Sequence, residues 1–196
     1  YYLFLALLLF SKENMALLGV FVGLSTLLFE KRDFKIHGLV TLAISAIYFV
    51  LALKLIAYFN GGIYPHWEYA ALGDSPAEAM KNIILHPIDT LLLLFDDPVK
   101  IKMWILLLMS GGVLAVLQPK YAILLIPVIA QKFFSSKPEF WGFSHHYAVE
   151  FAPIVAIGAA LAIHKLIPGK FQKYLIGTVV ALNLLILTQV HFYNGE

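Results

Sequence analysis

The chain has 196 residues, of which 61% are hydrophobic and only 13% are charged. A soluble domain is usually about 45–50% apolar and about 25% charged, so lipid must cover part of this surface and a water-soluble fold is excluded. The net charge of +2 gives no basis for nucleic-acid binding, and the absence of cysteine excludes disulfides, thiolate metal sites and cysteine nucleophiles.

Seven apolar runs predict helices, because every backbone amide in lipid must be hydrogen bonded. They cover residues 1–10, 15–29, 38–59, 103–118, 121–134, 147–167 and 174–192. The first run has no basic n-region and no cleavage site, and it is too short to cross a bilayer. We therefore expect it to be the end of a helix that begins upstream, in a longer polypeptide. The fold class predicted is all-α, a polytopic transmembrane helix bundle, with one transmembrane domain over residues 1–196.

The long segment 60–102 has a helical pattern of its own. Ser75-Pro76-Ala77-Glu78 is a capping box with proline at the first helical position, which predicts a helix over residues 76–85. His86-Pro87 ends that helix, because a residue before proline avoids the α region. A second piece, residues 88–95, is apolar enough to lie in the membrane interface.

The short loops predict the orientation of the chain. Basic residues gather in 30–35, at Lys120 and in 165–173, and the positive-inside rule makes these loops cytoplasmic. The segments expected to face outward together are 11–14, 60–102, 135–147 and 191–196.

Three groups of polar residues are candidates for chemistry on the outer side. Lys12 and Glu13 lie between two apolar runs and form either a charged pair that faces a polar cavity or a solvated turn. His145, His146 and Tyr147 precede Glu150, which shares a helix face with His146. Proton transfer, a metal site and a phosphate contact are all open for this group, as is a hydrogen-bonded pair that fixes the helix end.

The third group follows the long third run. Its aromatic residues are typical of an interfacial belt, but they are also able to stack on sugar rings while the acidic residue binds hydroxyls. The group is Tyr64-Pro65-His66-Trp67-Glu68-Tyr69, in which His66, Trp67, Glu68 and Tyr69 are the candidate binding residues.

The order of these features resembles an uncharacterised family of predicted prokaryotic membrane proteins, domain of unknown function 2079. The residues that carry the resemblance are Lys12-Glu13-Asn14, Gly19 and Gly23, Gly73-Asp74-Ser75-Pro76, His86-Pro87, Leu117-Gln118-Pro119, Pro127, Ser135-Ser136, His146-Tyr147 and Pro153. They correspond to the middle of a typical member, and Asn14 stands where the family often has Asp.

That family looks like the GT-C type of membrane glycosyltransferase, which takes a sugar from a polyprenyl-phosphate carrier at the outer face. The resemblance implies a catalytic Asp upstream of this chain. It also implies that Lys12 contacts the donor phosphate, that Trp67 and Tyr69 contact sugar or lipid, and that Glu13, His146 and Glu150 shape a polar pocket.

The leading hypothesis is therefore a multi-pass glycosyltransferase of the prokaryotic inner membrane. Its partners are membrane lipids and the polyprenyl-phosphate sugar donor, with no nucleic acid. The cofactor is unknown, and a divalent metal is compatible with the polar groups. A transporter or permease is one alternative, because intramembrane charges are its expected mark. A non-catalytic subunit that packs against other membrane proteins is another.

Overall fold

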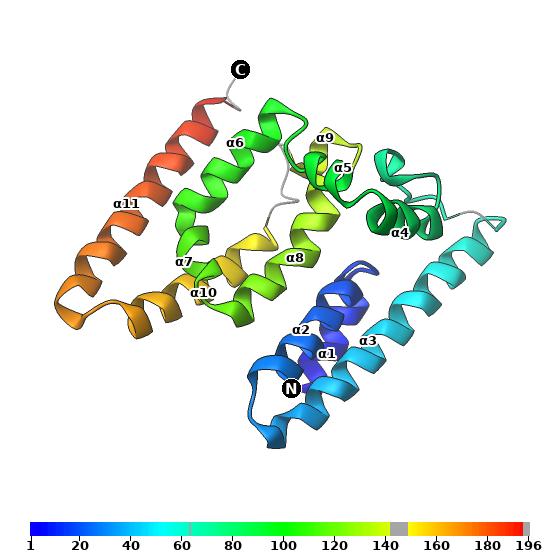
Figure 1. Ribbon diagram of the computed structural model, residues 1–196, viewed down its shortest axis with the longest axis horizontal. Helices are drawn as coiled ribbons and strands as arrows, with labels where there is room; N and C mark the ends of the chain where they lie inside the picture. Colours follow the sequence, from blue (N-terminus) through cyan, green and yellow to red (C-terminus); the bar gives the residue numbers. More distant parts are fainter. Residues whose placement is uncertain (63, 142–148, 194–196) are drawn as a thin grey trace. The chain divides into compact units, whose positions relative to one another are not determined.

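The computed structural model describes residues 1–62, 64–141 and 149–193, with side chains described as far as residue 187. Every regular element in these residues is helical, as the sequence predicts. The chain divides into two compact units, Tyr1–Trp67 and Glu68–Glu196, and each is described by itself (Figure 1).

The N-terminal unit contains three helices: α1 (Tyr2–Ser11), α2 (Met15–Phe29) and α3 (Arg32–Phe59). Extended backbone at Lys12 separates α1 from α2, so the first two apolar runs form a hairpin. The third helix begins earlier than its apolar run at residue 38, because polar residues form its first turn and Asp33 there favours a helix N-terminus.

Small residues bring α2 and α3 into close contact. A Cβ atom added to Gly23 would lie 2.5 Å from the Leu42 nitrogen and 2.8 Å from the Gly38 oxygen. One added to Gly19 would meet the Ser45 hydroxyl at 2.5 Å. Helices in lipid gain little from hiding apolar surface and associate through such close backbone packing.

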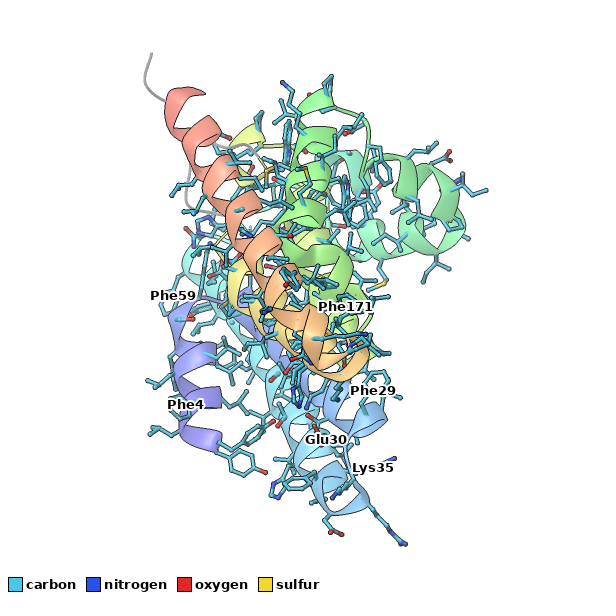
Figure 2. All side chains as sticks on the ribbon, turned by 90° about the vertical axis from the view of Figure 1, so that its left-hand side faces the viewer. Phe4, Phe29, Glu30, Lys35, Phe59 and Phe171 are labelled. Atoms are coloured by element: carbon cyan, nitrogen blue, oxygen red, sulfur yellow. The ribbon has the colours of Figure 1, made fainter. Side chains whose placement is uncertain are left out.

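Large apolar side chains cover much of the outer surface. Phe4 is 74% exposed and Phe59 is 76% exposed, and both project away from the ribbon (Figure 2). In the described part of the chain, three helical stretches are long and apolar enough to cross a membrane: Arg32–Phe59, Pro98–Val116 and Gly169–Leu187. These surfaces therefore belong in lipid.

The C-terminal unit combines short helical elements with three longer helices, α8, α10 and α11. Its elements are η1 (Ala70–Leu72), α4 (Pro76–Leu85), α5 (Pro87–Leu92), α6 (Pro98–Leu107), η2 (Leu108–Gly112), α7 (Val113–Val116), α8 (Pro119–Phe133), α9 (Pro138–Trp141), α10 (Phe151–Leu166) and α11 (Gly169–Tyr193). The capping box is confirmed: the Ser75 hydroxyl accepts from the Glu78 amide at 3.2 Å, and the Glu78 carboxylate accepts from the Asp74 amide at 2.9 Å. Since α5 begins at Pro87, the predicted break is confirmed as well.

One membrane-length stretch, Pro98–Val116, is interrupted. Its central segment η2 is a π-helix, and Gly111 there has a φ of 116°, which favours glycine. The Asn183 side chain of α11 donates to the Ser110 carbonyl at 3.2 Å, so a neighbouring helix supplies a hydrogen bond at the break. On the other side, α7 packs against Gly158 of α10.

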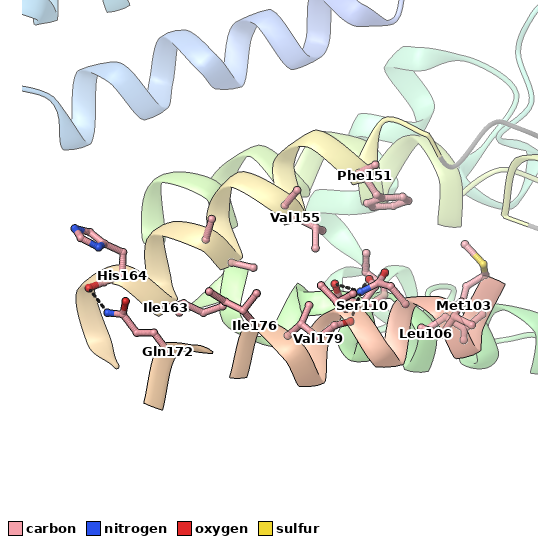
Figure 3. A pocket seen from close by; sticks show the side chains of 18 residues that line it. Met103, Leu106, Ser110, Phe151, Val155, Ile163, His164, Gln172, Ile176 and Val179 are labelled. Atoms are coloured by element: carbon pink, nitrogen blue, oxygen red, sulfur yellow. Dashed lines mark hydrogen bonds between the residues drawn. The ribbon is translucent and has the colours of Figure 1, made fainter. Parts of the chain in front are cut away.

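A cavity of about 830 Å³ lies between α6, η2, α10 and α11 (Figure 3). Its lining is mostly aliphatic along its length. Met103 and Phe151 lie at one end, and His164 and Gln172 lie at the other. We call this cavity the α10–α11 groove.

Candidate functional site

A buried ion pair joins the end of α8 to the beginning of α10. The Lys132 ammonium lies 2.5 Å from the Glu150 carboxylate and 5.7 Å from the centre of the Phe140 ring. Lys132 is only 1% exposed. A lysine in such a place needs a counter-charge, because burial of an isolated ammonium is costly. Glu150 supplies it.

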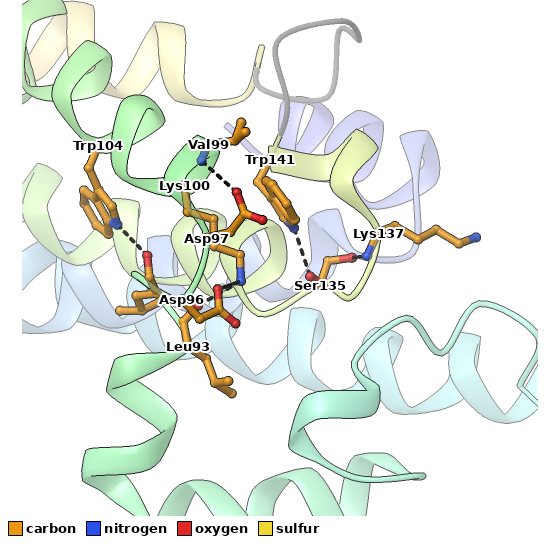
Figure 4. A network of polar contacts seen from close by, with 10 residues as sticks. Leu93, Asp96, Asp97, Val99, Lys100, Trp104, Ser135, Lys137 and Trp141 are labelled. Atoms are coloured by element: carbon orange, nitrogen blue, oxygen red, sulfur yellow. Dashed lines mark hydrogen bonds and ion pairs between the residues drawn. The ribbon is translucent and has the colours of Figure 1, made fainter.

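A second buried lysine lies in the first turn of α6. The Lys100 ammonium donates to the Leu93 carbonyl at 2.8 Å and pairs with the Asp96 carboxylate at 2.7 Å (Figure 4). It also lies 5.2 Å from the centre of the Trp141 ring, within the range of a cation–π interaction. The Asp97 side chain accepts from the Val99 amide and caps α6.

The loop after α8 connects these two lysines. The Trp141 indole donates to the Ser135 carbonyl at 3.0 Å. Beside it is a cavity of about 240 Å³, whose lining combines carboxylates, hydroxyls, an ammonium and aromatic rings. The residues that line it are Ala71, Leu93, Asp96, Asp97, Lys100, Phe134, Ser135, Ser136 and Trp141. We call this the Trp141 pocket.

The chain segment at the start of the unit closes over the same loop. The Glu68 carboxylate pairs with the Lys137 ammonium at 2.6 Å, and the Glu68 carbonyl accepts from the Ser136 amide at 2.7 Å. The Tyr69 hydroxyl donates to the Gln131 carbonyl at 3.3 Å. The result is a polar cluster at the end of the unit where α6 begins and α8 finishes.

The family described as Predicted membrane protein (DUF2079) matches residues 1–194. The chain belongs to this family. No curated protein matches the chain, and no solved structure matches it. The family description agrees with the membrane character of the chain and names no activity.

Three of the site residues predicted for this DUF2079 chain lie in the polar cluster: Glu68, Tyr69 and Glu150. The sequence suggested His146 as the partner of Glu150, and the structure places Lys132 there. His145, His146 and Tyr147 lie outside the described residues.

The other predicted residues belong to the N-terminal unit. The Glu13 carboxylate accepts from the Tyr64 hydroxyl at 3.2 Å, and the His66 ring meets the Tyr64 ring edge-on at 5.7 Å. Lys12 is exposed and Trp67 is half-buried. A common cavity that contains both Glu13 and Glu150 stays a prediction.

Lys100 and Lys132 were not identified as candidate site residues from the sequence. Lysines near helix ends usually extend toward water, so hydropathy alone gave them no special role. Lys132 carried a weak signal, because it stands directly before Phe133 in the last turn of a largely apolar helix. Among the described residues, no group of three or more His, Asp or Glu side chains is placed to hold a metal ion.

Proposed function

We propose that this DUF2079 protein is a GT-C-like glycosyltransferase of the prokaryotic inner membrane, a multi-pass enzyme that uses a polyprenyl-phosphate-linked sugar on the extracytoplasmic side. The observation that supports the proposal is the Trp141 pocket with its nearly buried Lys100. A lipid-linked sugar brings a phosphate and several hydroxyls to the bilayer surface. The pocket offers an ammonium to bind the phosphate, and carboxylates and hydroxyls to bind the sugar hydroxyls.

Each part of the pocket has a role in this proposal. In the transfer, the acceptor oxygen bonds to the anomeric carbon, a base takes the acceptor proton, and the bond from that carbon to the phosphate oxygen breaks. The phosphate leaves with the bonding electrons, so negative charge grows on it. Lys100 offsets that charge. Asp97 and Ser135 bind sugar hydroxyls, and Trp141 gives the sugar an apolar wall.

The buried ion pair has a different role, which is to position the pocket. Glu150 fixes Lys132 at the end of α8, and the loop that follows carries Ser135 and leads to Trp141. The residues predicted from the sequence enter the same proposal: Lys12 at the donor phosphate, Trp67 and Tyr69 at sugar or lipid, and Glu13, His146 and Glu150 around the polar pocket.

The test is transfer of labelled sugar from a polyprenyl-phosphate donor by the purified full-length protein. Lys100→Met should lower turnover at least tenfold, because the ammonium is lost and the apolar stem is kept. Lys102→Met is the matched control, since Lys102 lies in the same helix, is exposed, and is absent from the pocket lining. Its turnover should equal that of the unmutated protein.

Variants in the sequence-predicted residues extend the test. Glu13→Gln and His146→Ala should lower turnover, and Lys12→Ala should mainly weaken donor binding. If the unmutated protein transfers no sugar from any common donor, the proposal is wrong. If Lys100→Met transfers sugar as fast as Lys102→Met, the assignment of the pocket is wrong.

A transporter is a second candidate, and the break at Gly111 favours it. Discontinuous helices line the binding sites of many transporters. Here, η2 interrupts the Pro98–Val116 stretch and Asn183 bonds to it from another helix. The same purified protein in sealed vesicles separates the two functions: a transporter moves its substrate across the bilayer and transfers no sugar.

A further inference from the structure

The α10–α11 groove has the character of a lipid site. Aliphatic side chains line most of it, including Val155, Ile163 and Ile176 (Figure 3). The length along α10 from Phe151 to His164 is roughly 20 Å at about 1.5 Å per residue. One leaflet of a bilayer has a hydrocarbon depth of about 15 Å, half of the usual core. A tilted acyl chain from one leaflet therefore fills most of the groove.

The His164 end of the groove is strongly basic. Lys165 stands in the last turn of α10, and Lys170 and Lys173 stand in the first turns of α11. The Gln172 amide donates to the His164 carbonyl at 3.3 Å and to the Ile167 carbonyl at 2.9 Å, which holds the turn between the two helices.

No acidic residue of the nearby sequence offsets these charges. Residues 151–195 contain no Asp or Glu. Residues 98–138, which include α6 and η2, also contain no acid. The helices that form the groove therefore supply no carboxylate to neutralise the positive charge at this end.

The basic end and the aliphatic groove are continuous along α11. Lys173, Ile176 and Val180 are spaced three and four residues apart, so they share one face of the helix. Ile176 and Val180 line the groove, and Lys173 lies one turn beyond them. Lys170 and Lys173 also line a separate hollow of about 510 Å³ beside the turn.

We propose that the α10–α11 groove binds one anionic phospholipid of the membrane, with its phosphate at the basic turn and one acyl chain between α10 and α11. Charge complementarity selects an anionic headgroup, and the length of the groove selects an ordinary acyl chain over a much longer isoprenoid. The basic turn that holds the phosphate lies at the opposite end of α10 from Glu150. The lipid site therefore stands whether or not the protein transfers sugar.

The experiment measures lipid binding to the purified full-length protein in mild detergent by native mass spectrometry. The probes are phosphatidylglycerol, phosphatidylcholine with the same chains, and a polyprenyl phosphate. We expect phosphatidylglycerol to bind with one-to-one stoichiometry and at least tenfold more tightly than phosphatidylcholine. Each lysine near an anionic headgroup contributes about a fivefold factor in affinity. The combined Lys165→Gln, Lys170→Gln and Lys173→Gln variant should therefore weaken binding by about a hundredfold.

Two more variants complete the design. Ala160→Trp fills the groove from an exposed position of its lining and should abolish the one-to-one complex. Lys35→Gln, which removes an exposed lysine of the N-terminal unit, is the control and should bind like the unmutated protein. Size-exclusion profiles establish that each variant is folded. If the triple variant does not fold, Lys173→Gln alone replaces it, with an expected fivefold loss of affinity.

Three results would overturn the proposal. Equal binding of phosphatidylglycerol and phosphatidylcholine would remove the role of the basic turn. Undiminished binding in Ala160→Trp would place the lipid elsewhere. Tighter binding of the polyprenyl phosphate at this site would replace the phospholipid with the isoprenoid.

Discussion

The Lys132–Glu150 pair should be one of the strongest single interactions of the C-terminal unit, and a double-mutant cycle measures it. Lys132→Met removes the charge and keeps the apolar stem, which leaves Glu150 as a carboxylate with a side chain only 17% exposed. Removal of one partner from a buried ion pair costs about 3–5 kcal/mol. Because Glu150 retains some contact with water, we expect about 3 kcal/mol for Lys132→Met.

The reverse substitution, Glu150→Gln, leaves the fully buried ammonium facing a neutral amide. Its cost should also be about 3 kcal/mol, since the amide oxygen accepts a hydrogen bond but brings no charge. The double variant buries neither charge alone. Its cost should fall short of the sum of the single costs by about 2 kcal/mol, the coupling energy of the pair.

A matched pair in the same unit provides the control. The Lys137–Glu68 ion pair has nearly the same separation, 2.6 Å, but its lysine side chain is 52% exposed. Exposed ion pairs contribute about 0–1 kcal/mol, so the cycle with Lys137→Met and Glu68→Gln should give little coupling. Unfolding by dodecyl sulfate in mixed micelles, followed by tryptophan fluorescence, gives the free energies. Additive costs at Lys132 and Glu150, or equal coupling in the two pairs, would refute the role given to burial.

Three further predictions concern packing, topology and a helix end. Gly23→Ala should destabilise the N-terminal unit by about 1–3 kcal/mol, because backbone atoms occupy the space of the added methyl, whereas Gly177→Ala meets open space and should be neutral or better in the same unfolding assay. A cysteine at Asp74 should react with an impermeant thiol reagent in intact cells and one at Lys170 should not; the opposite pattern would reverse the predicted orientation. Ser75→Ala should cost about 1 kcal/mol of local stability in α4 by hydrogen exchange, and unchanged protection there would contradict the capping role.

Local signals in the sequence predicted the elements that depend on local chemistry. The capping box at Ser75 gave α4 its correct bounds, whereas the helix predicted over 121–134 begins two residues earlier, at Pro119. The helix predicted over 103–118 begins earlier, at Pro98, because two lysines interrupt its apolar pattern while Asp97 provides the cap. A hydropathy scale counts the charge of a lysine but contains no information about the group that neutralises it.

The candidate site was less accessible to sequence reasoning, because its contacts join residues far apart in the chain. Glu150 was identified as a candidate because it is a carboxylate at the start of an apolar helix. Its partner Lys132 lies earlier in the chain, on the other side of the short helix α9. Lys100 meets Trp141 across a sequence separation more than twice as long. No spacing rule connects such pairs, since only the packing of α6, α8, α9 and α10 brings them together.

The hydrogen bond between Asn183 and Ser110 has a consequence for the order of assembly during synthesis. The Pro98–Val116 stretch leaves the ribosome before α11 exists, and the asparagine that bonds to its break is 73 residues further along the chain. At typical translation rates this delay is on the order of several seconds. During that interval the break has to rely on water or on the insertion machinery for this bond. Chains that stop before α11 should therefore be recognised as incomplete by membrane quality control, even though the earlier spans have already been inserted.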